Sequence, residues 1–379
     1  MAGFIFSIGS NEQASILETL IKEGWYSTNL SAPKNNKWNT AMVSTLGDYL
    51  TMKPGDNIYF FSKRKIYGIG TLVSLKGDCK YCNYPNATEP KEFAYEKIKE
   101  SMLIKHPENM ENRFVCFFEP EPAFFKEGID MDEALSYKPE SYKSLRVFWK
   151  RSFIKLDDEE NMALKELFYL KNEQSIEKKE NTYEFDDSFH DACTRKINND
   201  YTIKIEPLIN SVTDKDKLTN EMVLEVSTLK EISTNPNTIF GHWDYLSHQV
   251  CASPFKPVDY MEKIDIYGYR KVKNSTAISK FLVMEIKKDI AAIDSVTQIA
   301  KYIDWIAQNN TYGNYDRIEA FILAYDFEEE VKKEYLNICK RTYTYGSHPT
   351  LTKTWANIRL IQYRCQNDTI EYTEVTESS

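Results

Sequence analysis

The sequence predicts two domains: a mainly β domain that forms a small, partly open barrel, and an α/β domain with helices around a mixed sheet. The chain has 379 residues, which is more than one compact domain usually holds. Short β-rich runs fill its first part, whereas strands and amphipathic helices alternate in its second part. A polar, charged stretch at 171–205 separates them. We therefore expect domains at 1–170 and 206–379, joined by a charged linker.

The first domain is expected to consist mainly of strands. The apolar run 3–8 predicts a first strand, and apolar residues at helical spacing predict a helix from residue 11 to about residue 23. The basic turn 62–65 joins two β-rich runs in a hairpin. The strands expected after the helix lie at 57–61, 66–73, 114–118 and 145–156.

The second domain shows a different order of elements. A capped helix is predicted at 219–229, an amphipathic helix at 293–307 and a charged helix at 328–340. The predicted strands lie at 263–269, 281–287, 318–324 and 357–363. The run 318–324 is almost unbroken in its apolar character, as buried central strands tend to be. This succession indicates an α/β sandwich around a mixed sheet.

Composition excludes several classes of protein. No apolar run approaches the ~18 residues of a membrane span, and the N-terminal residues lack the basic and apolar regions of a signal peptide. The seven cysteines are scattered and odd in number, so we expect no disulfide framework and a cytoplasmic location. The net charge of −9 argues against a general polyanion binder but leaves room for a local basic groove. The sequence has no Walker A motif and no Gly-x-Ser-x-Gly elbow.

The sharpest chemical pattern lies on two strands of the second domain. Glu285 and Lys287 alternate along one strand and so point to the same face. If the strands are adjacent hairpin arms, Asp265 meets Glu285 across the pair. Two carboxylates and a lysine then converge, a donor set that suits Mg²⁺ or Mn²⁺ and an ammonium beside a phosphate. Gln298 and Tyr302, four apart on the following helix, can reach the same place.

The pattern Asp265…Glu285-Ile-Lys287…Gln298-Ile-Ala-Lys-Tyr302 resembles the PD-(D/E)xK nuclease superfamily over roughly residues 215 to 365. The segment 283–305 is most similar to the RecB-type and NucS-type branch, whose glutamine–tyrosine helix follows the lysine at a similar distance. The resemblance implies a restriction-endonuclease-like fold. It also implies that Asp265 and Glu285 are metal ligands, that Lys287 is the catalytic lysine, and that Gln298 and Tyr302 are accessory.

The family often adds a glutamate on the helix before the first strand. Glu221 and Glu225 both qualify, and Glu221 is favoured. No proline precedes Asp265, unlike in the motif that names the family. The resemblance implies a Mg²⁺- or Mn²⁺-dependent DNA endonuclease, with a dimer or tetramer for double-strand cleavage. A sensor domain joined to such a core is typical of bacterial antiphage defence, as in Shedu-type nucleases or modification-dependent restriction.

Other interpretations of this pattern remain. Glu285 and Lys287 can be a buried structural ion pair, and an inactive nuclease fold can serve as a nucleic-acid-binding module. The NucS-like segment also allows a nuclease for mismatched or branched DNA. Two further groups of residues could ligate a metal, but ordinary loop packing is the favoured interpretation of both. These groups are Cys79 with Cys82, and His242, Asp244, His248 with Cys251.

The first domain resembles PUA-like domains, especially the EVE type. The residues that carry this resemblance are the strand 4–9, Trp38-Asn39, the segment 52–62 and the segment 66–70. In that family a pocket between barrel strands holds a flipped, often modified base, whose extrusion costs a few kcal/mol. The resemblance implies that the domain senses modified bases or DNA ends.

Within this resemblance, Trp38 and Phe61 are the expected pocket walls and Trp25 is a further candidate. Packing in the core is the alternative for each aromatic residue. The hairpin-tip cations Lys63, Arg64 and Lys65 can contact phosphates. The strand before residue 156 either closes the barrel or places Arg151 and Lys155 on DNA, and the sequence leaves both open.

Overall fold

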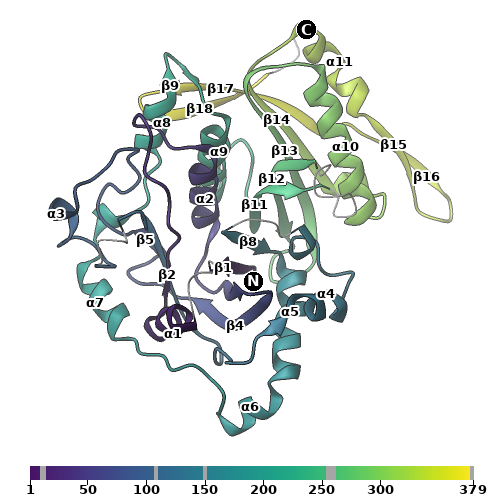
Figure 1. Ribbon diagram of the computed structural model, residues 1–379. Coiled ribbons are helices and arrows are strands. Elements are labelled where there is room, and N and C mark those ends of the chain that lie inside the picture. The colour runs from purple at the N-terminus through teal and green to yellow at the C-terminus, as the bar shows by residue number, and fades with distance from the viewer. Residues whose placement is uncertain (9–13, 106–109, 148–151, 253–261, 376–379) are drawn as a thin grey trace. The chain divides into compact units, whose positions relative to one another are not determined.

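The computed structural model describes residues 1–8, 14–105, 110–147, 152–252 and 262–375. The chain divides into two compact units, Met1–Ile205 and Glu206–Ser379. Each unit has its own large sheet and its own helices (Figure 1). Among the described residues, no helix is long and apolar enough to cross a membrane.

The first unit is built on a curved mixed sheet that forms a half-barrel. Its strands are β1 (Gly3–Ser7), β2 (Trp25–Tyr26), β3 (Asn57–Ser62), β4 (Lys65–Leu72), β5 (Lys80–Cys82), β6 (Phe114–Pro120), β7 (Ile129–Asp130) and β8 (Phe153–Leu156). The order is β2-β6-β4-β3-β1-β8, with β5 on β6 and β7 on β4. β1 and β3 run parallel, and the other pairs are antiparallel. The hairpin of β3 and β4 and the first strand agree with the sequence prediction.

More helix surrounds this sheet than the sequence suggested. The helices are α1 (Ala14–Glu23), α2 (Thr40–Thr51), α3 (Tyr95–Ile98), α4 (Met131–Tyr137), α5 (Asp158–Lys171), α6 (Glu173–Lys178) and α7 (Ser188–Lys196). Leu164 and Phe168 of α5 pack into an apolar cluster with Ile5 and Tyr59 of the sheet. Asp157 and Glu160 form a capping box that fixes where α5 begins. The start expected for α1 at residue 11 lies outside the described residues.

Two sequence predictions in this unit need correction. Residues 171–205, expected as a linker, belong to the first unit, because His190, Cys193 and Tyr201 bury their side chains there. His190 Nε2 lies 2.8 Å from the carbonyl oxygen of Gly24, for example. The predicted strand 145–156 is a 3-10 helix at Leu145–Val147 followed by β8, with 148–151 outside the described residues.

The second unit contains a mixed sheet of six strands (Figure 1). They are β11 (Tyr245–Cys251), β12 (Lys263–Lys271), β13 (Ile278–Ala291), β14 (Ile318–Phe327), β17 (Ile358–Gln366) and β18 (Thr369–Glu374), in the order β11-β12-β13-β14-β17-β18. β13, β14 and β17 run parallel, whereas the outer neighbours pair antiparallel. Both edge strands, β11 and β18, were not predicted from the sequence.

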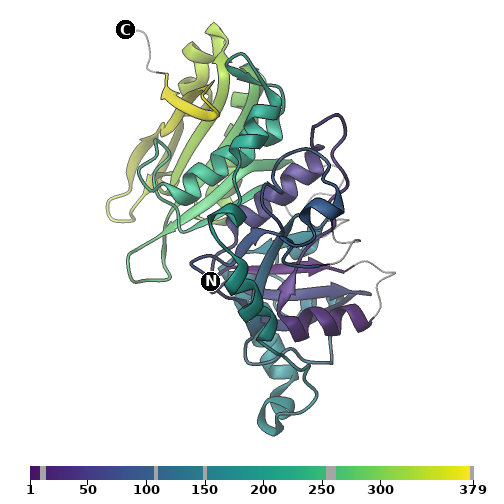
Figure 2. The same ribbon diagram turned by 90° about the vertical axis from the view of Figure 1, so that its left-hand side faces the viewer.

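Helices cover both faces of this sheet. They are α8 (Glu206–Val212), α9 (Glu221–Thr234), α10 (Ile293–Asn309) and α11 (Glu329–Cys339). Figure 1 shows α10 and α11 on one side of the sheet and α9 on the other. α9 starts at the Asn220 cap, and α10 buries Val296, Ile299 and Ile303 at helical spacing. Figure 2 shows α9 along the face of the strands from a second direction.

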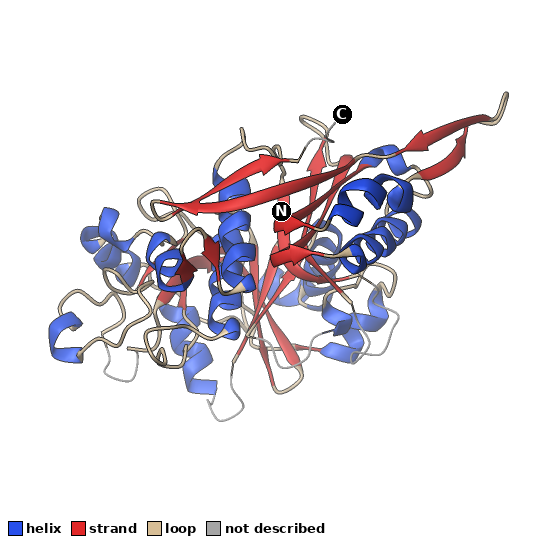
Figure 3. Ribbon diagram, turned by 90° about the horizontal axis from the view of Figure 1, so that it is seen from above, coloured by secondary structure: helices blue, strands red, loops and turns tan. Residues whose placement is uncertain are grey.

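Two further pairs of strands complete the second unit. β9 (Thr213–Asp214) and β10 (Lys217–Leu218) form a short antiparallel pair before α9. β15 (Arg341–Tyr345) and β16 (Leu351–Trp355) form a separate two-stranded ribbon. The ribbon projects from the unit beyond α11, as Figures 1 and 3 show.

Candidate active site

The strand register brings Asp265 and Glu285 together. β12 and β13 are adjacent antiparallel arms in which Ile266 lies opposite Met284, so the next position outward on each arm holds Asp265 and Glu285. Asp265 Oδ2 accepts a hydrogen bond from the backbone N–H of Ile286 at 2.7 Å. The carboxylate of the first arm therefore lies against the backbone of the second at the position that carries Glu285.

Lys287 lies on the same strand face as Glu285. Its ammonium donates to Glu285 Oε1 at 2.6 Å. The Glu285 side chain is 1% exposed, whereas that of Lys287 is 32% exposed, so the lysine reaches from the buried acid towards solvent. The second oxygen, Glu285 Oε2, is buried and has no hydrogen-bond partner in the part of the chain that the structure describes. A buried polar atom without a partner is costly unless something else binds it.

Burial and mutual repulsion raise the pKa values of Asp265 and Glu285. Burial raises the pKa of Glu285 to about 7, with Lys287 opposing the shift and Glu221 and Glu225 adding to it. Burial, Glu285 and Glu225 raise the pKa of Asp265 well above its usual range. Burial lowers the pKa of Lys287, but Glu285 outweighs that effect and the pKa is raised overall. A bound cation relieves this repulsion, since it favours the charged form of each acid.

Two glutamates of α9 also face this cluster. Glu221 is half-buried, and its Oε2 accepts from the backbone N–H of Lys288 at 3.0 Å. Glu225, one turn later, is 2% exposed, and its carboxylate contacts side chains of β11. His248 Nδ1 lies 3.0 Å from Glu225 Oε1. The α9 glutamate favoured by the sequence is thus near the site, and so is its alternative.

A single amide connects Glu225 with Asp265. Gln249 Nε2 donates to Glu225 Oε2 at 2.8 Å and to Asp265 Oδ1 at 3.2 Å. The Gln249 backbone adopts a left-handed φ of 51°, an uncommon conformation for a side-chain-bearing residue. The bridging role of Gln249 was not predicted, because β11 reads from the sequence as a loop. No alternation of polar and apolar residues marks this strand, whose first four residues are all buried.

Gln298 and Tyr302 of α10 form a hydrogen-bonded pair at the start of β12. Gln298 Nε2 donates to the Tyr302 hydroxyl at 2.6 Å, and this hydroxyl donates to the carbonyl oxygen of Lys263 at 2.9 Å. Burial raises the pKa of Tyr302, and the charges of Glu285 and Asp265 add to the shift. The pair therefore fixes the strand two residues before Asp265 and lies within electrostatic reach of both acids.

The donor set fits a hard divalent cation. No group of three His, Cys, Asp or Glu side chains able to hold a metal occurs among the described residues. Mg²⁺ usually keeps several waters, however, and binds through one or two carboxylates plus substrate phosphates. Asp265 and Glu285 supply two carboxylates, and the partnerless Glu285 Oε2 supplies a buried oxygen suited to a cation. The residues present therefore match Mg²⁺ or Mn²⁺.

The other groups weighed as metal sites do not come together. His242 is exposed and lies 3.5 Å from Asp244, whereas His248 is buried against Glu225. Cys79 and Cys82 are free, buried thiols, and burial raises the pKa of each to about 12. Thiols held protonated in this way are poor metal ligands, since the thiolate is the ligand.

In the first unit, the predicted aromatic walls are interior residues. Trp38 is 3% exposed and packs edge-on against Phe114, with the guanidinium of Arg113 5.7 Å from its ring. Phe61 is half-buried against the core cluster of this unit. Their packing follows the core alternative. Trp25 is the exception, because it lines a cavity.

The predicted phosphate contacts of this unit differ in exposure. Lys63, Arg64 and Lys65 are exposed at the β3–β4 turn, where Arg64 pairs with Asp132 at 2.6 Å. Lys155 instead points inward and donates to the carbonyl oxygen of Thr51 at 3.0 Å, and burial lowers its pKa to about 8. Of the two alternatives for its strand, the structure has Lys155 in β8 paired with β1. Arg151 lies outside the described residues.

Comparisons with known proteins leave the family of this chain open. No protein-family model matches it, and no curated protein matches it. A solved structure that is similar is the crystal structure of a repair endonuclease from Pyrococcus abyssi, with 22% sequence identity and a TM-score of 0.21. The match covers 29% of this chain and 41% of that chain, so less than half of the length of that protein is represented.

Proposed function

We propose that this protein is a metal-dependent DNA endonuclease that hydrolyses phosphodiester bonds. The observation that carries the proposal is the convergence of Asp265, Glu285 and Lys287, with the buried Glu285 Oε2 lacking a partner among the described residues. A structural ion pair accounts for Glu285 Oε1 and Lys287 but leaves this second oxygen and the adjacent Asp265 as an unexplained cost. A divalent cation accounts for the second oxygen of Glu285 and for the adjacent Asp265, and leaves the contact of Lys287 with Glu285 Oε1 in place.

In this proposal Asp265 and Glu285 hold the ion. Bound Mg²⁺ or Mn²⁺ supplies a Lewis acid for the scissile phosphate and lowers the pKa of an attacking water. The Lys287 ammonium stabilises the negative charge that develops on the phosphate, and its partial exposure lets substrate reach it. Gln249 orients Asp265, while Gln298 and Tyr302 fix the start of β12 and so position that same carboxylate.

The distribution of charge around the second sheet supports DNA as the substrate. The chain is acidic overall, yet it has no Asp or Glu between Asp265 and Glu285, nor between Glu334 and Asp368. Parts of these two segments meet at the start of β14, because Phe281 pairs with Ile318 and Trp355 Nε1 donates to the carbonyl oxygen of Ile318. Their cations are Arg270, Lys271, Lys273, Lys280, Lys340, Arg341, Lys353, Arg359 and Arg364. Six of these nine form ion pairs with acids of neighbouring segments: Arg270, Lys280, Arg341, Lys353, Arg359 and Arg364.

The β15–β16 ribbon lies within the second of these segments. Every residue from 344 to 354 is exposed, so the ribbon buries little apolar surface of its own. Thr342 pairs with Thr354 and Thr344 with Thr352, which puts four exposed hydroxyl groups on one face. Threonine hydroxyls and lysines are common partners of phosphates, and a two-stranded ribbon fits the ~12 Å major groove of DNA. Its base is held by Arg341, which donates twice to Asp304 at 2.8 and 2.9 Å.

The wider role that we propose is antiphage defence, with the first unit sensing DNA ends or modified bases. This part rests on the resemblances in the sequence and on the exposed turn of Lys63, Arg64 and Lys65. Cutting both strands of a duplex requires at least two active sites, and we therefore propose a dimer or tetramer. Sedimentation that finds only monomers during double-strand cutting contradicts that assembly.

The test is a cleavage assay with the full-length protein and its Glu285→Ala variant. Plain duplex, modified phage DNA, and mismatched or flapped duplexes are each incubated with Mg²⁺, Mn²⁺ or EDTA. The proposal predicts metal-dependent cutting that the variant lacks, while an Ala substitution of the exposed Glu371 on the same sheet leaves cutting unchanged. A preference for modified DNA supports the defence role, whereas a preference for mismatches or flaps supports repair. Metal-dependent cutting that persists in Glu285→Ala refutes the site.

A further inference from the structure

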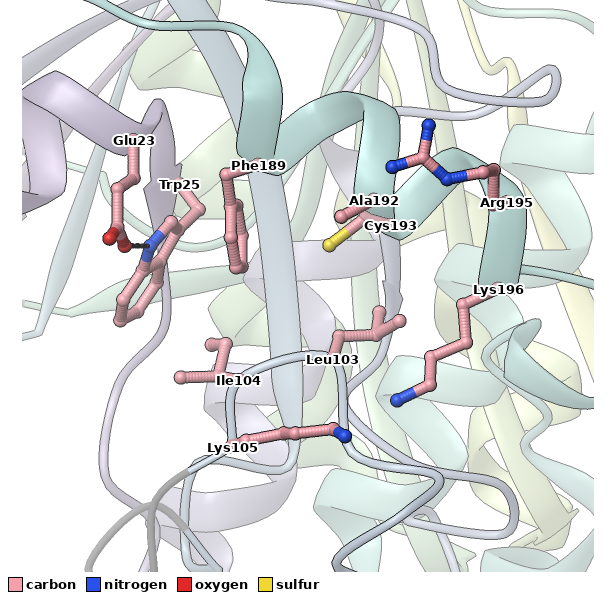
Figure 4. A pocket seen from close by; sticks show the side chains of 10 residues that line it. All are labelled: Glu23, Trp25, Leu103, Ile104, Lys105, Phe189, Ala192, Cys193, Arg195 and Lys196. Atoms are coloured by element: carbon pink, nitrogen blue, oxygen red, sulfur yellow. Dashed lines mark hydrogen bonds between the residues drawn. The ribbon is translucent and has the colours of Figure 1, made fainter.

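The first unit contains a cavity outside its barrel core. Its volume is about 760 Å³, within the range of roughly 300–1,000 Å³ found for small-molecule sites. Figure 4 shows the ten side chains that line it. They are Glu23, Trp25, Leu103, Ile104, Lys105, Phe189, Ala192, Cys193, Arg195 and Lys196. The expected barrel-pocket walls Trp38 and Phe61 are not among them.

Helix α7 forms one wall of this cavity. Phe189, Ala192, Cys193 and Lys196 recur at helical spacing and so lie on one helix face. Opposite them stand Leu103 and Ile104, both almost fully buried. The part of the chain that reads as a charged linker thus supplies half of a largely apolar site.

Aromatic rings make up one end of the cavity. Trp25 and Phe189 lie side by side with ring centroids 6.0 Å apart and planes inclined by 38°, as Figure 4 shows. The Trp25 indole is held by its N–H, which donates to Glu23 Oε2 at 2.6 Å. A fixed indole beside a second ring offers a planar ligand a stacking surface.

The remaining edge carries excess positive charge. Among the lining residues, Lys105, Arg195 and Lys196 outnumber the one acid, Glu23, which is already bonded to Trp25. Lys105 also pairs with Glu100, outside the lining, at 3.3 Å. Lys196 donates to the carbonyl oxygen of Met102 at 2.7 Å, a partner that leaves its charge unbalanced. Burial lowers the pKa of Lys196, and repulsion from the Lys105 ammonium adds to this, so the two ammonium groups act on each other. An anionic group relieves that repulsion.

We propose that this cavity binds a nucleotide, with the base against Trp25 and Phe189 and the phosphate at Lys105 and Lys196, whose ammonium groups point toward each other in Figure 4. Arg195 adds positive charge from the outer side of α7. The ligand class combines a planar ring, which matches the aromatic end, with an anion, which matches the cations. The apolar wall of Leu103, Ile104 and Cys193 gives the base a further surface to pack against. This site is independent of the nuclease proposal, since all of its residues belong to the first unit.

The test is calorimetric titration of the full-length protein with adenosine, guanosine, cytidine and uridine monophosphates. EDTA is present, so any metal site in the second unit is silent. Ribose 5-phosphate and adenosine serve as half-ligands. Two variants probe the cavity: Arg195→Glu at an exposed cation and Ala192→Trp, which adds bulk from an exposed helix position. Lys97→Glu, an exposed cation of α3 that does not line the cavity, is the charge-matched control. Circular dichroism and melting temperature verify that each variant folds.

At least one monophosphate should bind with a Kd below about 1 mM, and each half-ligand should bind about tenfold or more weakly. Arg195→Glu and Ala192→Trp should each weaken binding about tenfold or more, and Lys97→Glu should not. The inference is overturned if no monophosphate binds at millimolar concentration, if both cavity variants bind as the wild type does, or if an aliphatic anion such as decanoate binds and the nucleotides do not.

Discussion

Replacement of Glu285 by glutamine should stabilise the metal-free protein while abolishing cleavage. Glutamine keeps the shape of the side chain and removes the charge that burial disfavours. The pKa of Glu285 is raised from the usual 4.5 to about 7, a value that already includes the favourable contact with Lys287. One pKa unit corresponds to about 1.4 kcal/mol, so the ionised carboxylate costs the folded state about 3 kcal/mol at pH 8.

The pH dependence follows from the direction of this shift. Because the folded-state pKa lies above the unfolded one, the contribution of this carboxyl to stability is fully present below about pH 4.5 and is lost as the pH rises through about 7. The difference between variant and wild type should therefore be near zero at pH 4.5 and reach its maximum above pH 7. For a unit of this size, about 3 kcal/mol corresponds to roughly 6–12 °C in melting temperature.

The assay is thermal unfolding of both proteins in EDTA from pH 4.5 to pH 8.5, repeated with excess Mg²⁺. The metal should stabilise the wild type by about 2.7 kcal/mol at a concentration of 100 Kd, and so raise its melting temperature, and should leave the variant unchanged. Glu371→Gln, at an exposed carboxyl on β18, is the control and should shift neither curve. A variant that is less stable than the wild type at pH 8, or a difference that does not change with pH, refutes this reasoning.

Three further predictions follow from the same geometry. Gln249→Asn keeps a residue type that tolerates the left-handed backbone but shortens the side chain whose amide bridges Glu225 and Asp265. Half-maximal cleavage should therefore require about 10–100-fold more Mg²⁺, and an unchanged metal requirement rules out the bridge. Tyr302→Phe removes the hydroxyl that donates to the carbonyl oxygen of Lys263. The free energy of unfolding in urea should fall by about 1 kcal/mol, and cleavage should be slower without being abolished; unchanged stability contradicts this contact. Replacing residues 343–353 by an Asn-Gly turn should weaken duplex binding by catalytically inactive protein and reduce the slope of log K against log salt by about one; equal affinity and slope mean that the ribbon does not contact DNA.

The inner elements of the second unit were predictable because their hydrophobic periodicity is strong. β13 contains the apolar run 281–284, β14 is mostly apolar, and α10 repeats isoleucine at helical spacing. The edge strands β11 and β18 were missed, since edge strands mix polar and apolar residues and lack that signal. In the first unit the charge of residues 171–184 masked the apolar residues that follow, and these tie α7 to the sheet.

The candidate site shows the same division. Asp265, Glu285 and Lys287 follow from alternation along two strands, which is local information. The contact of Glu225 with His248 and Gln249 depends on how α9 packs on β11, and no short-range pattern carries that. Trp38 could not be assigned to a pocket or to the core from the sequence, because both environments select aromatic residues; in the structure it is buried against Phe114.

The most direct test of the central claim is the rate at which the protein nicks supercoiled DNA in Mg²⁺, compared with that of Lys287→Met. Methionine keeps the length of the apolar stem and removes only the ammonium that contacts Glu285. The account predicts that the variant nicks at least about 100-fold more slowly than the wild type and keeps the metal-induced rise in melting temperature. Equal rates in the two proteins, with equal dependence on Mg²⁺, contradict the assignment of catalysis to this site.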